Sequence, residues 1–112
     1  MASFERYYAT GITELSAATT VHTSNASDAT QADIVIGMTI TNTGTTTASV
    51  SAYISGAGST DVYLGKEIQI PQSGSIEIIK GKIVLDNTDV VKVKVHSGQA
   101  DVWLSVLDDA SA

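Results

Sequence analysis

An alternation of side chains over residues 32–55 constrains the fold of this chain more than any other feature. In residues 34–41 every second position is Ile, Ile, Met and Ile, and residues 48–54 repeat the pattern with Ala, Val, Ala and Ile. A period of two is typical of a β-strand. Asn42-Thr43-Gly44-Thr45 lies between the two runs and predicts a turn, so we expect an antiparallel hairpin with one apolar face. A lone hairpin is marginally stable in water, so further strands must cover that face.

Shorter runs of the same kind continue to the end of the chain. Strand-like segments occupy residues 19–23, 61–64, 67–70, 76–78, 83–85, 91–95 and 101–107, and turn-forming stretches separate them, including Pro71-Gln72-Ser73-Gly74 and a glycine-rich turn at 55–60. No helical period lasts for more than a turn or two, and β-branched residues are frequent. The pattern predicts an all-β chain of about eight strands, folded as an antiparallel β-sandwich of the jelly-roll or immunoglobulin-like type.

The alternation also predicts which side chains form the core. The inner faces are expected to bury one set of aliphatic residues: Ile36, Ile40, Val50, Ile54, Ile70, Ile78, Val93 and Leu104. The domain boundaries follow from where the pattern holds. We predict a poorly patterned N-terminal arm at 1–18, a β-sandwich domain at 19–108 and a flexible tail at 109–112.

Four large aromatic residues are the predicted partner-binding residues. Phe4, Tyr7 and Tyr8 lie in the predicted arm, and Trp103 points away from its apolar neighbours in the last strand. Rings without a core position either anchor a neighbouring subunit or pack back on their own domain. The sequence leaves both alternatives open for the three rings of the arm.

Composition excludes several classes of function. The chain has 112 residues and a formal net charge of −6, which argues against nucleic-acid binding, since that affinity comes largely from neutralising phosphates. Cysteine is absent, so disulfides, thiolate chemistry and cysteine-ligated zinc are excluded. No run is long enough to span a membrane and no signal peptide is visible, so we expect synthesis in a cytoplasm and no membrane partner. Lysines at 80, 82, 92 and 94 are interpreted as residues for strand-edge protection or solubility, or as an interface to an acidic partner.

No constellation of residues indicates catalysis or metal binding. His22 and His96 have no second histidine at ligand spacing and are interpreted as surface or turn residues. The turn at 86–89 offers carboxylate oxygens but lacks the other ligands of a calcium loop. Glu67 and Glu77 occupy outward-facing positions of successive strands, and no motif frames a nucleophilic serine. We therefore predict no enzyme activity, no catalytic residue, no metal and no cofactor.

Five segments of the chain resemble segments of a known protein family. They are residues 36–43, 50–54, 69–75, 82–93 and 101–107, and together they extend over about residues 33–108. In this order they resemble small structural proteins of tailed-bacteriophage virions. The resemblance implies a compact β-sandwich displayed on the particle, with no enzymatic residues to transfer.

The function expected from this resemblance is a virion structural protein. We predict a capsid decoration or cement protein that binds the major capsid protein shell, forms a homo-oligomer with a trimer favoured, and is made in the host bacterial cytoplasm before it joins the virion. The alternatives are a neck or tail-associated adaptor and a carbohydrate-binding β-sandwich on a phage fibre, with Trp103, Tyr53 or Tyr63 as stacking platforms. Clustered exposed aromatic residues would favour the sugar binder, and an arm ordered only in an assembly would favour the virion role.

Overall fold

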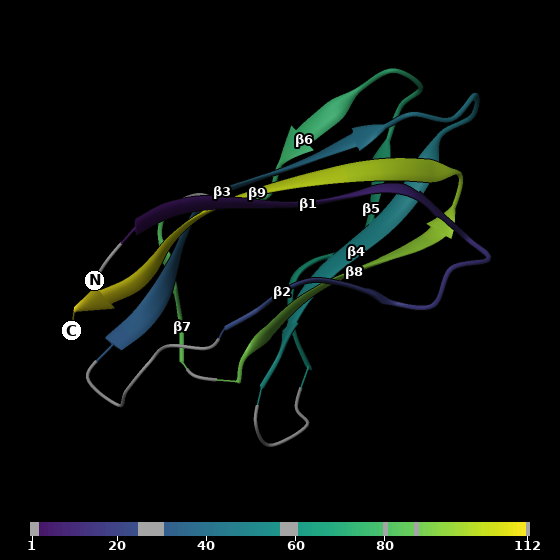
Figure 1. Cartoon of the computed structure of the whole chain (residues 1–112). Coiled ribbons are helices and arrows are strands. Elements are labelled where there is room, and N and C mark those ends of the chain that lie inside the picture. Colours follow the sequence, from purple (N-terminus) through teal and green to yellow (C-terminus); the bar gives the residue numbers. More distant parts are fainter. Residues whose placement is uncertain (1–2, 25–30, 57–60, 80, 87, 112) are drawn as a thin grey trace.

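The computed structural model describes residues 3–24, 31–56, 61–79, 81–86 and 88–111, which fold as a β-sandwich (Figure 1). The strands are β1 (Ser3–Thr13), β2 (Thr19–Thr23), β3 (Gln31–Asn42), β4 (Ala48–Ser55), β5 (Asp61–Ile70), β6 (Ser75–Glu77), β7 (Ile83–Leu85), β8 (Val90–Ser97) and β9 (Gln99–Ser111). The predicted all-β fold class is confirmed. The part of the chain that the structure describes includes no helix that could cross a membrane.

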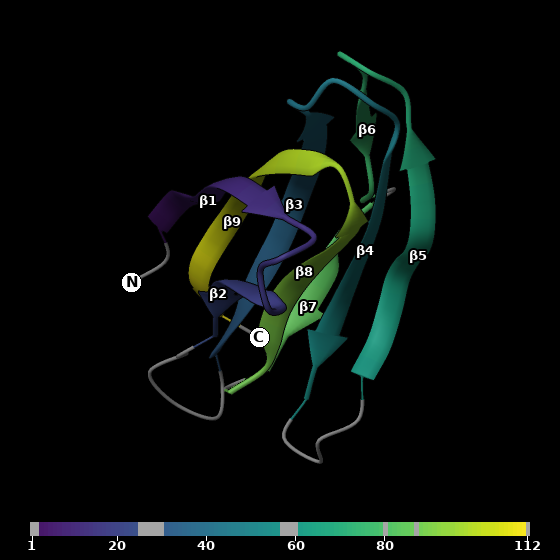
Figure 2. The same ribbon diagram turned by 90° about the vertical axis from the view of Figure 1, so that its right-hand side faces the viewer.

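The strands form two antiparallel sheets, which Figure 2 shows as two layers. The first sheet has the order β1-β9-β3, and both β6 and β7 pair with β3; the second has the order β2-β8-β4-β5. β6 pairs with residues 39–41 of β3 and β7 with residues 33–35, so the two short strands occupy one position beside β3. Counted in this way, the order is that of a jelly roll, with eight strand positions divided between two sheets.

The core between the sheets agrees with most of the predicted set. Ile40, Val50, Ile70, Val93 and Leu104 are fully buried. Ile54 and Ile78 are partly buried and pack against this core. Ile36 is the exception, because its side chain is 41% exposed.

A β-bulge explains the exposure of Ile36. Val35 pairs with Val106 and Gly37 pairs with Ser105, so Ile36 is an extra residue on β3 with no partner on β9. The bulge shifts the alternation by one residue, and Val35 is buried instead, at 2% exposure. In the part of β3 that precedes the bulge, the side chains of odd-numbered residues therefore face inward.

The predicted hairpin of residues 32–55 is wrong, because β3 and β4 belong to different sheets. Asn42 provides the physical reason, since its buried side chain holds the chain in an arch between the sheets. Its amide nitrogen donates to the carbonyls of Thr46 (2.8 Å) and Ile70 (2.9 Å), and its oxygen accepts the N–H of Gly44 (2.9 Å). The two apolar runs face each other across the core, and β4 pairs with β5 instead.

The predicted ends of the domain also require correction. Residues 3–13 of the predicted arm belong to the sandwich itself, because β1 pairs with β9 along the edge of the first sheet. The predicted tail is mostly strand, because β9 continues to Ser111 and pairs with the start of β3. The alternation in β1 is weak because its inward side chains include one tyrosine and one alanine, which do not form an aliphatic stripe.

The structure also bears on the interpretation of two lysines and on the turn predicted at 86–89. Lys92 and Lys94 do not protect an edge, because β8 lies in the interior of the second sheet. The turn at 86–89 is closed by the Asp89 carboxylate, which accepts the N–H of Asp86 at 3.0 Å, as expected for a turn. Residues 1–2, residues 25–30, residues 57–60 of the glycine-rich turn, Lys80, Asn87 and Ala112 lie outside the described residues.

Candidate functional site

The outer face of the first sheet carries a group of exposed apolar and aromatic side chains. We call it the aromatic face and define it by Phe4, Arg6 and Tyr8 of β1, Ile36 of β3 and Trp103 of β9. Phe4 is 76% exposed, Tyr8 57% and Trp103 47%. The strand alternation puts these residues on the side of the sheet that the second sheet does not cover.

The rings at the centre of the aromatic face are held together by strand register. Tyr8 pairs directly with Trp103, and their rings stack with centroids 5.9 Å apart and planes 16° apart. The Arg6 guanidinium carbon lies 5.6 Å from the Tyr8 ring centroid and 5.4 Å from that of Trp103. Cation–π attraction and stacking therefore order three large side chains in a surface position, which lowers the entropy that binding would cost.

Two shallow hollows flank this stack. One has a volume of about 320 Å³ and is lined by Tyr8, Trp103 and polar neighbours: Thr10, Thr39, Thr41 and Asp101. The other, of about 590 Å³, lies between Phe4, Arg6, Ile36 and Ser105. The small side chain of Ser105 lines the second hollow between the larger residues.

The four predicted partner-binding residues divide into two groups. Phe4, Tyr8 and Trp103 share the aromatic face, whereas Tyr7 points between the sheets. Trp103 faces away from its buried neighbours, as the alternation predicted. The partner-binding role of these residues stays a prediction. The alternative platforms Tyr53 and Tyr63 form a separate pair on the second sheet, with ring centroids 5.1 Å apart.

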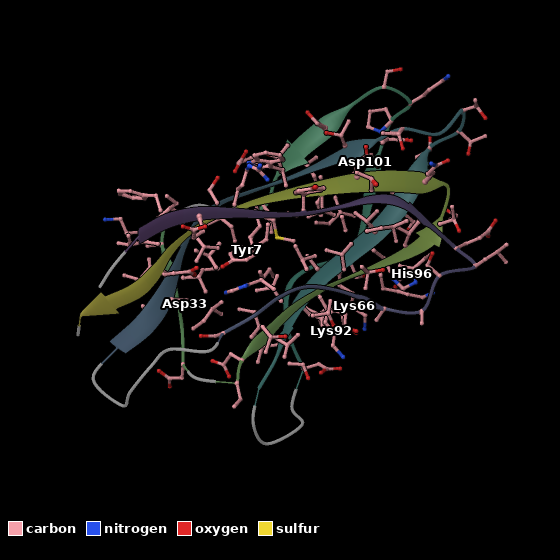
Figure 3. All side chains as sticks on the ribbon, viewed as in Figure 1. Tyr7, Asp33, Lys66, Lys92, His96 and Asp101 are labelled. Carbon is pink, nitrogen blue, oxygen red and sulfur yellow. The ribbon has the colours of Figure 1, made fainter. Side chains whose placement is uncertain are left out.

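Tyr7 belongs to a second group of side chains, which lies inside the sandwich. Tyr7 (β1), His22 (β2), Asp33 (β3) and Asp108 (β9) form what we call the His22 cluster. Figure 3 shows Asp33 on β3 toward the end of the molecule where Figure 1 marks the two chain ends, and Tyr7 farther along, below the β1 ribbon. His22 and Asp33 are buried, so the interpretation of His22 as a surface or turn residue is wrong.

Direct contacts join the four side chains. His22 Nε2 lies 2.8 Å from Asp33 Oδ2 and 3.9 Å from Asp108 Oδ1. The Tyr7 hydroxyl donates to Asp108 Oδ2 at 2.5 Å, and the Tyr7 ring stacks on His22 with centroids 4.0 Å apart. Asp108 Oδ1 is buried, and no atom in the described part of the chain forms a hydrogen bond with it. One carboxylate oxygen is therefore fixed by the tyrosine, while the other faces the imidazole.

Burial raises the pKa of two side chains of this cluster, Asp108 and Tyr7. It raises the pKa of the Asp108 carboxyl, the Tyr7 hydrogen bond opposes that rise, and the nearby Asp33 charge adds to it. Burial also raises the pKa of the Tyr7 hydroxyl well above its usual range, and the hydrogen bond and charge of Asp108 raise it further. Tyr7 is therefore a hydrogen-bond donor at neutral pH.

Irregular strand pairing assembles the cluster, which is why the alternation did not reveal it. In β2 the pairing shifts between Thr20 and His22, so Val21 and His22 are both buried although they are consecutive. The Ile36 bulge turns Asp33 inward, and a further shift in register lies opposite Asp33 on β9. The signal in the sequence was a histidine and two aspartates at the ends of strands, which is too common to identify a site.

Other residues considered for chemistry are not arranged for it. Ser51 Oγ lies 2.8 Å from His96 Nε2, but Ser51 is buried and its oxygen already accepts the N–H of Glu67. A nucleophile needs access to substrate, which this serine lacks. Glu67 lies on β5 of the second sheet and Glu77 on β6 of the first, so the two carboxylates do not flank a common groove.

Comparisons with protein-family models, with curated proteins and with solved structures found no match to this chain.

Proposed function

We propose that the chain is a structural protein of a tailed-bacteriophage virion, which decorates the capsid shell by binding the major capsid protein. The observation that carries this proposal is the aromatic face, where Phe4, Tyr8 and Trp103 are exposed together on one sheet. The resemblance of residues 33–108 to virion structural proteins supplies the class of partner.

The composition of the aromatic face suits a protein interface. Trp, Tyr and Arg are the residue types that contribute most to binding energy at interfaces, and here Arg6 lies over both rings of the Tyr8–Trp103 stack. Phe4 and Ile36 extend the apolar surface along the strands, and the hollow between them could accept a side chain from a partner. An apolar surface of this kind is normally covered in a functional assembly.

The charge of the chain affects how copies assemble. At −6, neighbouring copies repel one another, so contacts must form where apolar surface or basic residues offset the repulsion. Arg6 is one of only six basic residues, and it lies at the centre of the aromatic face. A shell of many symmetric copies would add the small contribution of each contact.

A binding role is proposed in preference to catalysis. In the described part of the chain, Ser51 of the Ser51–His96 pair is buried, and the two glutamates considered for hydrolysis, Glu67 and Glu77, lie on different sheets. Jelly rolls include viral capsid and lectin domains, so the fold by analogy agrees with binding but does not choose the ligand.

A co-sedimentation experiment tests the proposal. The purified chain is mixed with capsid shells assembled without it and centrifuged, and bound protein is measured in the pellet. Trp103→Ala and Tyr8→Ala should each reduce binding by at least tenfold, whereas Tyr63→Ala, which removes an exposed ring from the second sheet, should bind as the unchanged chain does. No binding of the unchanged chain, or equal losses in Tyr8→Ala and Tyr63→Ala, would contradict the proposal.

A carbohydrate-binding role is the second candidate, and the hollow beside Trp103 favours it. Threonine hydroxyls and the Asp101 carboxylate surround a stacked aromatic pair, which is a suitable arrangement for a sugar ring. The chain has a single tryptophan, so its fluorescence reports on this face. A saturable fluorescence change with host-surface oligosaccharides, together with no binding to shells, would favour this role over decoration.

A further inference from the structure

The His22 cluster contains a set of side chains that can bind a divalent metal ion. His22 Nε2, one oxygen of Asp33 and one oxygen of Asp108 all lie within 4.8 Å of one another. The three residues come from β2, β3 and β9, so they connect the two sheets. One imidazole nitrogen and two carboxylate oxygens are ligands that zinc and similar ions accept.

The unpaired oxygen of Asp108 is a second observation that points to a ligand at this place. Asp108 Oδ1 is buried without a hydrogen-bond partner among the described residues, and it lies 3.9 Å from His22 Nε2. Buried polar atoms are almost always satisfied, and a bound ion is one of the recognised explanations for an exception. The Tyr7 hydroxyl holds the other oxygen of the same carboxylate, so Oδ1 is kept directed toward the imidazole.

The charges of the cluster favour a dication. Two carboxylates within the sandwich carry two negative charges when ionised, and a protonated His22 would neutralise only one of them. A divalent ion beside a neutral imidazole balances both, which reduces the cost of burying them. Binding of the ion also requires the deprotonated forms of all three ligands, so protons would be released as it binds.

We propose that His22 Nε2, Asp33 and Asp108 Oδ1 bind one zinc ion, or a similar divalent ion, that links the two sheets at this end of the sandwich. Ligand atoms at ordinary zinc distances are roughly 3.4 Å apart in a tetrahedral site. The separations from His22 Nε2, 2.8 Å to Asp33 Oδ2 and 3.9 Å to Asp108 Oδ1, lie on either side of that value. Water would complete the coordination, and Tyr7 is a positioning residue that orients the Asp108 carboxylate.

Such a site would stabilise a protein that has no cysteine for disulfide bonds or for a thiolate metal site. The ion joins β2, at the edge of the second sheet, to β3 and β9 of the first. Because it binds the folded chain and not the unfolded one, its effect should appear as a rise in melting temperature. This proposal does not depend on the function proposed above.

The test is metal binding by the full chain after treatment with a chelator and dialysis. Calorimetric titration with zinc should give a stoichiometry of one, and zinc at about 100 times its Kd should raise the Tm by about 10 °C. His22→Gln and Asp108→Asn should lose both effects. His96→Gln, which changes the exposed histidine, should retain them.

A measurement on the unchanged chain covers the case in which a variant fails to fold. Cobalt(II) in place of zinc should give the visible absorption bands of a site of low coordination number, and zinc should displace it. The absence of stoichiometric zinc binding by the unchanged chain would overturn the proposal. Binding that survives in His22→Gln but is lost in His96→Gln would also overturn it, because the ion would then lie elsewhere.

Discussion

The bulge at Ile36 leads to a stability prediction opposite to that of simple alternation. Val35 is 2% exposed and Ile36 is 41% exposed. Val35→Ala removes two buried methyl groups, worth about 0.8 kcal/mol each by transfer, and leaves a cavity, so it should lower the free energy of unfolding by about 2–3 kcal/mol. Ile36→Ala removes a half-exposed side chain, and it should cost less than about 1 kcal/mol.

Denaturation in urea measures both values. Each free energy of unfolding is obtained by linear extrapolation, and similar slopes for the two variants would show that the unfolded states are comparable. A larger loss for Ile36→Ala than for Val35→Ala would refute the bulge. In that case Asp33 would point to solvent, and the His22 cluster could not form.

Other predictions follow from particular contacts. Asn42→Ala removes three hydrogen bonds of the arch between the sheets, and it should lower the free energy of unfolding by about 2–4 kcal/mol in urea, whereas the exposed Thr43→Ala should cost less than about 0.5 kcal/mol. The pKa of Asp108 is raised in the folded state, so its contribution to folding stability is fully present below the unfolded pKa of about 4 and is lost as pH rises through the raised value. Thermal melts should show this pH dependence in the unchanged chain and not in Asp108→Asn. Tyr7→Phe removes the hydrogen bond that lowers the Asp108 pKa, so an NMR titration of that carboxyl should show a further rise. Sedimentation velocity of the unchanged chain should show a homo-oligomer, with a trimer expected, and a monomer at every concentration would contradict this expectation.

Local patterns predicted the strands well but not their partners. The alternation in residues 34–41 and 48–54 identifies two strands, each with one apolar face. It does not say whether those faces lie side by side in one sheet or opposite each other in two. That choice depends on the arch and on Asn42, whose hydrogen bonds reach the carbonyl of Ile70, distant in sequence. Pairing is therefore a tertiary property that a two-residue period does not contain.

The two sites differ in how far the sequence could reveal them. Trp103 lies in a regular stretch of β9, so the aliphatic residues on either side predicted its outward direction correctly. His22 and Asp33 lie beside irregular pairings, where one extra residue reverses the face to which a side chain points. Bulges leave no reliable mark in a single sequence, so the buried cluster could be recognised only in three dimensions.

The most direct test of the proposed function is the copy number of this chain in purified virions, measured by quantitative mass spectrometry against the major capsid protein. Decoration of the shell predicts a fixed ratio to the major capsid protein, with many copies in each particle. A handful of copies would assign the chain to the neck or tail instead. Its absence from purified particles would contradict the account of a virion structural protein.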